Sequence, residues 1–149
     1  MKYIKTFEHI MDNVLTLNDK GLFIISNIPD TTTELYCYNN NLKELPTLPE
    51  TLEILSCFNN VLRELPTLPH SIKKIFCYSN NLKELPTLPY SLKTLNCSNN
   101  NLSELPLLPE TLEILVCEGN NLPYNNLDEY NKWLEINHPD IFNAKKFNI

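Results

Sequence analysis

The chain has 149 residues with 12 basic and 18 acidic side chains, a formal net charge of −6 and a pI near 5.0. This length predicts one ordinary domain with a sizeable core. The acidic balance, without a Lys/Arg cluster, argues against a nucleic-acid backbone binder, and the longest apolar run, GLFII, is far below the roughly 20 residues of a membrane span.

The first predicted element is a helix over residues 1–14. Ile4, Phe7, Met11 and Val14 recur at spacings close to three and four, which favours an amphipathic helix that caps the core. Charges interrupt MKYIKTFEHIMDNVL every few positions, unlike the apolar segment of a secretory leader. We therefore expect a chain that is not exported by a conventional signal.

A 20-residue repeat fills the centre of the chain. Residues 32–122 hold five copies of the frame LxxLxCxxNxLxELPTLPxx, the last incomplete, and residues 15–31 hold a degenerate copy. In the degenerate copy, Leu17 stands where every other copy has a cysteine. This substitution indicates that the cysteine column requires an apolar side chain.

Each repeat combines a strand with an extended return segment. Stretches such as ILSCF and KIFCY alternate with period two, which predicts short strands. Strands of successive repeats pair in parallel about 4.8 Å apart. Prolines three apart, such as Pro46 and Pro49, exclude a helix from the return segment and favour a polyproline-type path.

The repeat resembles the leucine-rich repeat family, whose signature is LxxLxLxxNxL. The second half, xxLPxLPxx, is similar to the shortest subclass, familiar from secreted effectors of pathogenic bacteria and from repeat proteins of giant viruses. The resemblance covers roughly Leu15 to Leu122 and implies an α/β fold: a right-handed parallel-β horseshoe with few helices except end caps. Cysteine at the sixth place departs from the family, as does Asn125 at a leucine position, where we expect the solenoid to stop.

A second helix is predicted after the repeats, within residues 123–149. NNLDEYNKWLEIN begins with a candidate Asn cap and acids in the first turn, and it places Leu127, Tyr130 and Leu134 on one face. We expect this helix to cap the last coil, with Trp133 packing onto that coil rather than anchoring a partner. The sequence predicts no conformation for the tail from His138 onward.

The evenly spaced thiols first indicate reactive or metal chemistry. Side chains stacked in register point the same way, whereas a disulfide needs converging Cβ atoms near 3.8 Å, and a straight column cannot surround a tetrahedral zinc ion. Burial also raises a thiol pKa and lowers its reactivity. We expect core-filling cysteines, with no metal and no cofactor; their odd number favours a reducing, cytoplasmic location. The five are Cys37, Cys57, Cys77, Cys97 and Cys117.

A column of asparagines has a structural explanation. A buried amide without partners costs roughly 2–7 kcal/mol, so its recurrence predicts hydrogen bonds to the backbone of its own and neighbouring coils. The ladder consists of Asn40, Asn60, Asn80, Asn100 and Asn120.

The charged and imidazole side chains carry no recognisable chemistry. Lys43, Arg63 and Lys83 stand beside a glutamate in each repeat, the pattern of a solvated face. The three histidines have no spacing that gathers metal or triad partners. In effector relatives that are enzymes, a separate ubiquitin-ligase domain with its own cysteine follows the repeats. About 27 residues follow Leu122 here and none is cysteine, so we expect no enzyme.

Residues beside the cysteines face the concave surface of the predicted sheet, and five of them in the first three repeats are aromatic. Stacked rings stabilise a sheet by themselves, but exposed aromatic area is also typical of interaction surfaces. We predict a non-catalytic module that binds a protein, in the host cytoplasm for a viral or effector protein. The alternative is a structural or self-associating chain, a homodimer for instance, using this face or the tail IFNAKKFNI. The candidate partner-binding residues are Tyr36, Tyr38, Ile54, Phe58, Phe76, Tyr78 and Val116.

Overall fold

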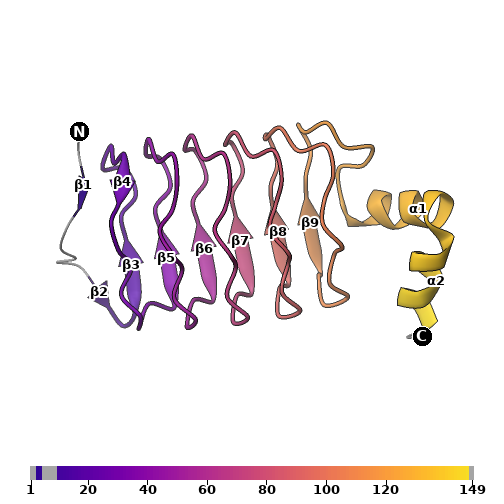
Figure 1. Ribbon diagram of the computed structural model, residues 1–149, viewed down its shortest axis with the longest axis horizontal. Helices are drawn as coiled ribbons and strands as arrows, with labels where there is room; N and C mark the ends of the chain where they lie inside the picture. Colours follow the sequence, from indigo (N-terminus) through magenta and orange to yellow (C-terminus); the bar gives the residue numbers. More distant parts are fainter. Residues whose placement is uncertain (1–2, 5–9, 148–149) are drawn as a thin grey trace.

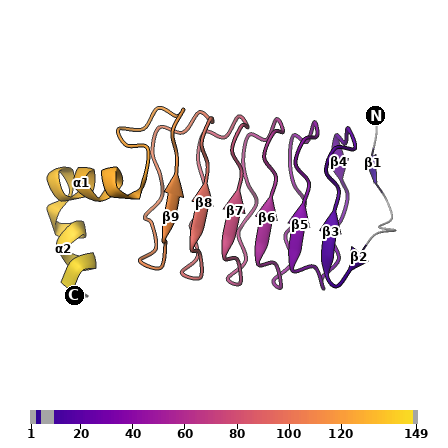
Figure 2. The same ribbon diagram turned by 180° about the vertical axis from the view of Figure 1, so that it is seen from behind.

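The computed structural model describes residues 3–4 and 10–147 and shows a stack of regular coils closed at the C-terminal end by two helices (Figure 1). The strands of the coils lie side by side on one side of the stack, and the return segments run along the other (Figure 2). The predicted leucine-rich repeat solenoid is thereby confirmed. Its elements are β1 (Tyr3–Ile4), β2 (Ile10–Met11), β3 (Val14–Thr16), β4 (Ile24–Ile25), β5 (Glu34–Tyr36), β6 (Ile54–Ser56), β7 (Lys74–Phe76), β8 (Thr94–Asn96), β9 (Ile114–Val116), α1 (Leu127–Asn137) and α2 (Pro139–Phe147).

The main sheet has seven strands in the order β2-β3-β5-β6-β7-β8-β9. From β3 to β9 every pair is parallel, and residues 20 apart stand opposite each other, as Leu35 does with Leu55. The constant 20-residue period of the sequence therefore sets the register in which neighbouring strands pair. Each strand contributes one central buried residue flanked by two that point outward, so the same columns form the core in every coil.

The core is a series of stacked leucine, isoleucine and cysteine layers. Leu35, Leu42 and Leu52 are fully buried, and so are their equivalents at intervals of 20 as far as Leu102. All five cysteines are free thiols with an exposed fraction of 0%. Burial raises the pKa of Cys37 to about 12 and that of Cys57 well above its usual value. The thiols therefore act as small apolar side chains at neutral pH.

The return segments contain no helix in the described residues between β4 and α1. Each of these segments ends in a turn in which the carbonyl of the second proline accepts a backbone N–H three residues later, as Pro49 does from Leu52 at 3.0 Å. The same bond recurs from Leu92 to Pro89 at 3.1 Å. Proline suits this place because it has no N–H of its own to leave unpaired.

The asparagine runs occupy two specialised positions. Asn39, Asn59 and Asn99 have φ values of 54°, 50° and 53°, in the left-handed region, which asparagine tolerates better than most side chains. The next asparagine in each run points inward. Asn60 accepts the backbone N–H of Leu42 at 3.0 Å and donates to the carbonyls of Cys37 and Cys57. Each ladder asparagine thus joins two coils.

The predicted N-terminal helix is wrong for the residues that the structure describes. Tyr3–Ile4 is a strand paired with β4, and Ile10–Met11 forms an antiparallel hairpin with β3; residues 5–9, including Phe7, lie outside the described residues. The hairpin turns at Asp12 and Asn13, with φ of 52° and 66°. Two consecutive positive φ values match the twist of a two-residue hairpin loop, and this local signal prevails over the helical spacing.

The C-terminal cap begins where the solenoid pattern ends. Asn126 caps α1 by accepting the backbone N–H of Glu129 at 3.0 Å, and the Glu129 carboxylate in turn accepts from the Asn126 side chain and from the backbone N–H of Asn125. Tyr130 and Leu134 are buried against the last coil. The tail, for which the sequence made no prediction, forms α2. Within the described residues, no helix is long and apolar enough to cross a membrane.

Candidate protein-interaction surface

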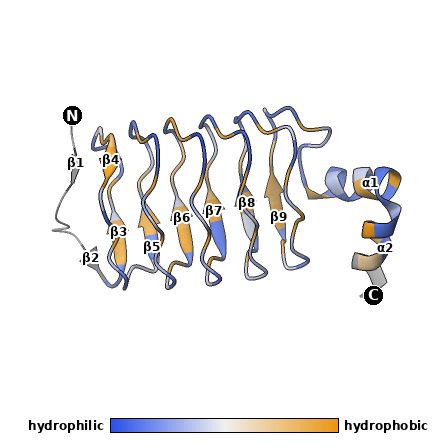
Figure 3. Cartoon of the chain, viewed as in Figure 1, coloured by the Kyte–Doolittle hydropathy of each residue, from blue (hydrophilic) through white to orange (hydrophobic). Residues whose placement is uncertain are grey.

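The predicted concave surface is the open face of the seven-stranded sheet, which we call the strand face. In β5 to β9 the central residue, such as Leu55 or Ile75, is buried, and the residues before and after it stand on this face. The strands differ in hydropathy along it: β6 and β9 are apolar, β7 is mixed, and β8 is more polar (Figure 3). The face therefore changes chemical character along the stack.

Three rings form a continuous stack on the N-terminal half of the strand face. The centroids of Tyr38 and Phe58 are 4.4 Å apart with an interplanar angle of 6°, and those of Phe58 and Tyr78 are 4.4 Å apart at 7°. The strand spacing of 4.7–4.9 Å sets this distance. All three side chains are half-buried, so their edges reach solvent while their faces cover one another.

The row of the strand face that passes through Tyr36 is more varied. The Tyr36 hydroxyl donates to a Glu34 carboxylate oxygen at 2.7 Å, and this bond is the main reason that the pKa of Tyr36 rises to about 12. Ser56 stands opposite Tyr36 on one side and Phe76 on the other. Because this small residue separates them, Tyr36 and Phe76 do not stack. Ser56 is only 4% exposed, so the surface is recessed between the two rings.

The remaining predicted residues do not all join these rings. Ile54 stands between Glu34 and Lys74 on neighbouring strands and borders the aromatic residues. Val116 lies two strands beyond Phe76, with Asn96 between them, and pairs with Asn126 in an antiparallel bridge. The structure thus gathers six of the seven residues on β5 to β7 and their following turns, and leaves Val116 beside the C-terminal cap.

The aromatic residues are bordered by polar and charged groups. Lys73 pairs with Glu53 at 2.7 Å and Lys93 with Glu113 at 3.0 Å, all about half-exposed. Exposed pairs of this kind contribute little to stability. The stack ends at Ser98, whose hydroxyl donates to Asn96 at 2.7 Å. An apolar centre with a polar rim is the general composition of a protein interface.

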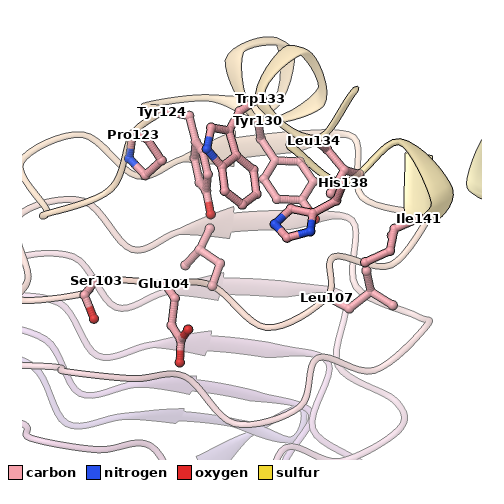
Figure 4. Close-up of a pocket in the computed structure, with 11 residues that line it drawn as sticks. Ser103, Glu104, Leu107, Pro123, Tyr124, Tyr130, Trp133, Leu134, His138 and Ile141 are labelled. Carbon is pink, nitrogen blue, oxygen red and sulfur yellow. The ribbon is translucent and has the colours of Figure 1, made fainter. Parts of the chain in front are cut away.

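A second hollow, which the sequence analysis missed, lies on the return side beside the C-terminal helices. A pocket of about 490 Å³ is lined by aromatic and aliphatic side chains and by Glu104. Trp133 packs against the core, as expected, and its ring centroid is 5.3 Å from Tyr124 and 5.0 Å from His138. Figure 4 shows these rings on one side of the pocket and Ser103 and Glu104 on the other. The available signal was the change in the return segment from KELPT to SELPL, at Ser103 and Leu107.

The described side chains show no arrangement typical of catalysis. The five thiols are buried with raised pKa values, whereas a nucleophilic cysteine requires a lowered one. Among the described residues, no three His, Cys, Asp or Glu side chains are grouped as metal ligands.

Comparison with solved structures identifies the repeats. The chain is similar to the leucine-rich repeat domain of a Shigella effector, with 38% identity and a TM-score of 0.72 over 75% of this chain and 51% of that one. This chain is a short-repeat leucine-rich repeat protein. It is also similar to YopM, a leucine-rich effector protein from Yersinia pestis, with 32% identity and a TM-score of 0.65 over 74% of this chain and 44% of that one.

A third similar structure is YopM from Yersinia enterocolitica, with 32% identity and a TM-score of 0.56 over 66% of this chain and 27% of that one. This leucine-rich repeat protein therefore spans about half or less of each of these three structures. No protein-family model matches the sequence, and a search of curated proteins found no match. Similarity to effector repeat domains supports a protein-interaction module in general.

Proposed function

We propose that this leucine-rich repeat protein binds a partner protein, without catalysis, through the strand face. The contact is centred on the aromatic patch, defined as Tyr36, Tyr38, Phe58, Phe76 and Tyr78, with Ile54 beside it and Val116 at its far edge. By analogy with effector repeat domains, we propose a host protein as the partner and the host cytoplasm as the place of binding.

The observation that carries this proposal is the half-buried stack of Tyr38, Phe58 and Tyr78. The rings stack face to face with centroids 4.4 Å apart, and this packing restricts their motion before a partner binds. A rigid side chain loses little conformational entropy on binding, and tyrosine is enriched among the residues that dominate interface energies. Cross-strand stabilisation alone explains the stacking of the faces but assigns no role to the exposed edges and hydroxyls.

The test is affinity capture with a variant in which Tyr38, Phe58 and Tyr78 are all replaced by serine. The matched control is Tyr90→Ser, because Tyr90 lies on the return side with an exposed fraction of 69%. The strand-face variant is expected to lose the partner that both the parent and the control retain, with circular dichroism spectra unchanged. Retention of the partner by a folded triple variant contradicts the proposed site.

Self-association is the competing explanation, since the strand face of one copy is able to meet that of another. Light scattering over a hundredfold range of protein concentration separates the two. A mass that stays at one chain eliminates the dimer, whereas a mass that rises with concentration and falls back in the triple serine variant replaces the partner proposal with a homodimer.

A further inference from the structure

We propose that the pocket between the return segment of residues 103–107 and the C-terminal helices binds a basic side chain, arginine or lysine, of a partner protein. This site lies on the return side of the solenoid, away from the strand face, and does not depend on the aromatic patch. Its walls combine apolar and aromatic groups with one carboxylate, that of Glu104.

The repeats provide an internal comparison for this pocket. In three preceding copies the return segment reads Lys or Arg, Glu, Leu, Pro, Thr, whereas the copy at the pocket reads Ser103, Glu104, Leu105, Pro106, Leu107. The cation is lost, the acid is kept, and the threonine becomes an exposed leucine. In the described structure Glu104 makes no ion pair, and neither do Glu44, Glu64 and Glu84, but each of those three has a cation next to it in the chain. The two changes leave a carboxylate beside an apolar wall, without the cation that accompanies it in the other copies.

The charge distribution along the chain also favours a cationic ligand. Residues 1–100 carry ten acidic and nine basic side chains, whereas residues 101–149 carry eight acidic and three basic ones. The C-terminal third therefore holds almost the whole net charge of −6. A field of one sign attracts the opposite charge and raises its local concentration.

The two ends of the pocket match the two parts of a basic side chain. The aromatic end, with Trp133 and Tyr124, offers an apolar surface for an aliphatic stem, and an indole face also attracts a cation. Ser103 and Glu104 stand at the opposite end (Figure 4). A side chain lying across the pocket brings its charged head to the Glu104 carboxylate while its methylene groups contact Leu105 and Trp133.

Trp133 is the single tryptophan of the chain, so the NMR signal of its indole N–H reports on this pocket directly. The probes are three acetylated and amidated tripeptides: Ala-Arg-Ala, Ala-Lys-Ala and Ala-norleucine-Ala. A saturable shift of the indole signal is expected with the arginine or lysine peptide. The neutral norleucine peptide is expected to bind about tenfold more weakly, because it has the stem without the charge.

Two variants locate the charge. Glu104→Gln is expected to weaken binding of the arginine peptide about fivefold, the size of an exposed ion pair, whereas Glu84→Gln, at the same place one coil earlier, leaves it unchanged. Ser103→Lys restores the residue type of the other copies and is expected to weaken binding of the arginine peptide at least as much as Glu104→Gln, because it places a second cation beside the Glu104 carboxylate. Both positions are exposed, so neither variant is expected to disturb the fold.

Three results overturn the proposal. The first is that none of the three peptides shifts the indole signal. The second is that the norleucine peptide binds as tightly as the arginine and lysine peptides, which shows that the pocket selects apolar stems and not charge. The third is an unchanged affinity for arginine in Glu104→Gln. None of these results depends on the strand face, so failure here and failure of the strand-face proposal are distinguishable.

Discussion

The carboxamide oxygen of Asn60 accepts the backbone N–H of Leu42 at 3.0 Å, although the two residues lie on different coils. The same amide donates to the carbonyls of Cys37 and Cys57 at 3.1 and 3.0 Å. One side chain therefore satisfies three buried backbone groups that no strand pairing reaches. The ladder asparagines bind the coils together through polar contacts inside an otherwise apolar core.

Replacement of Asn60 by alanine is expected to lower the free energy of unfolding by about 1–3 kcal/mol, because the buried Leu42 N–H loses its partner and an unsatisfied buried group costs about that much. The carbonyls of Cys37 and Cys57 keep the hydrogen bonds that Asn40 and Asn80 donate to them. Urea denaturation measures the change. The control is Asn81→Ala, at an exposed asparagine that follows a ladder position, which is expected to have a negligible effect. Equal losses for the two variants contradict the structural role of the ladder.

Replacement of Thr32 by valine is expected to stabilise the protein by about 1 kcal/mol. Thr32 is fully buried in a column that otherwise holds leucine or isoleucine, and its hydroxyl has no hydrogen-bond partner within the described structure. Valine has the same shape without the unpaired polar group. Thermal unfolding compares it with Thr51→Val, which removes a hydroxyl whose single hydrogen is shared between the Asp30 and Thr32 carbonyls at 2.7 and 2.8 Å. The Thr51 variant is expected to be destabilised. A lower melting temperature for the Thr32 variant refutes this reasoning.

Alkaline pH is expected to destabilise the protein through its thiols. Burial raises the pKa of Cys37 to about 12 and that of Cys117 to about 11, whereas a thiol in an unfolded chain ionises near pH 8.5. Because the folded pKa is the higher one, this stabilisation is complete below about pH 8.5 and is lost as the pH rises towards 11–12. Each thiol contributes a slope of up to about 1.4 kcal/mol per pH unit.

Denaturant titrations from pH 7.5 to 9 measure that slope below the ordinary tyrosine pKa of about 10. The variant Cys57→Ala removes one fully buried thiol. It is expected to reduce the pH dependence of the free energy of unfolding by the contribution of one thiol, whatever its effect on stability at neutral pH. A free energy of unfolding that stays constant over this range is incompatible with five buried thiols.

The aromatic stack is expected to stabilise the sheet measurably. Phe58 has a ring on each side, and a ring pair contributes about 0.5–1.5 kcal/mol beyond burial. Phe58→Ala is therefore expected to lower the free energy of unfolding by about 1–3 kcal/mol more than Phe76→Ala does. Phe76 is a suitable comparison because it is a half-buried phenylalanine of the next coil and makes no ring contact among the described residues. Chemical denaturation of both variants gives the difference, and equal costs indicate that the stacking geometry carries no energy of its own.

The sequence determined the central coils because their period is exact. A 20-residue repeat places Leu35 opposite Leu55 whatever the details of the turns, and Leu17 in a cysteine column indicates that the column is apolar. The asparagine amides were expected to meet the backbone because nothing else in a coil is able to satisfy them. The C-terminal helix was equally readable, since Asn126 and Glu129 form a local capping pattern.

The ends of the solenoid were harder to predict because their sequences are not repeated, so no periodic pattern supports the assignment. The spacing of Ile4, Met11 and Val14 favoured a helix, but the consecutive positive φ values of Asp12 and Asn13 turn that segment into a hairpin. The pocket beside Trp133 depends on how α1 packs against a return segment, which no periodic pattern encodes. Whether the exposed edges of Tyr38 and Tyr78 contact a partner stays a prediction.

The parallel sheet meets an antiparallel neighbour at both ends. At one end β2 runs against β3, and at the other Asn126 forms an antiparallel bridge with Val116, while the Asn125 carbonyl accepts the N–H of Cys117 at 2.9 Å. A stack of identical coils is otherwise a template on which another copy is able to continue the ladder. Reversing the strand direction at each end interrupts the parallel register that another copy would need in order to continue the ladder.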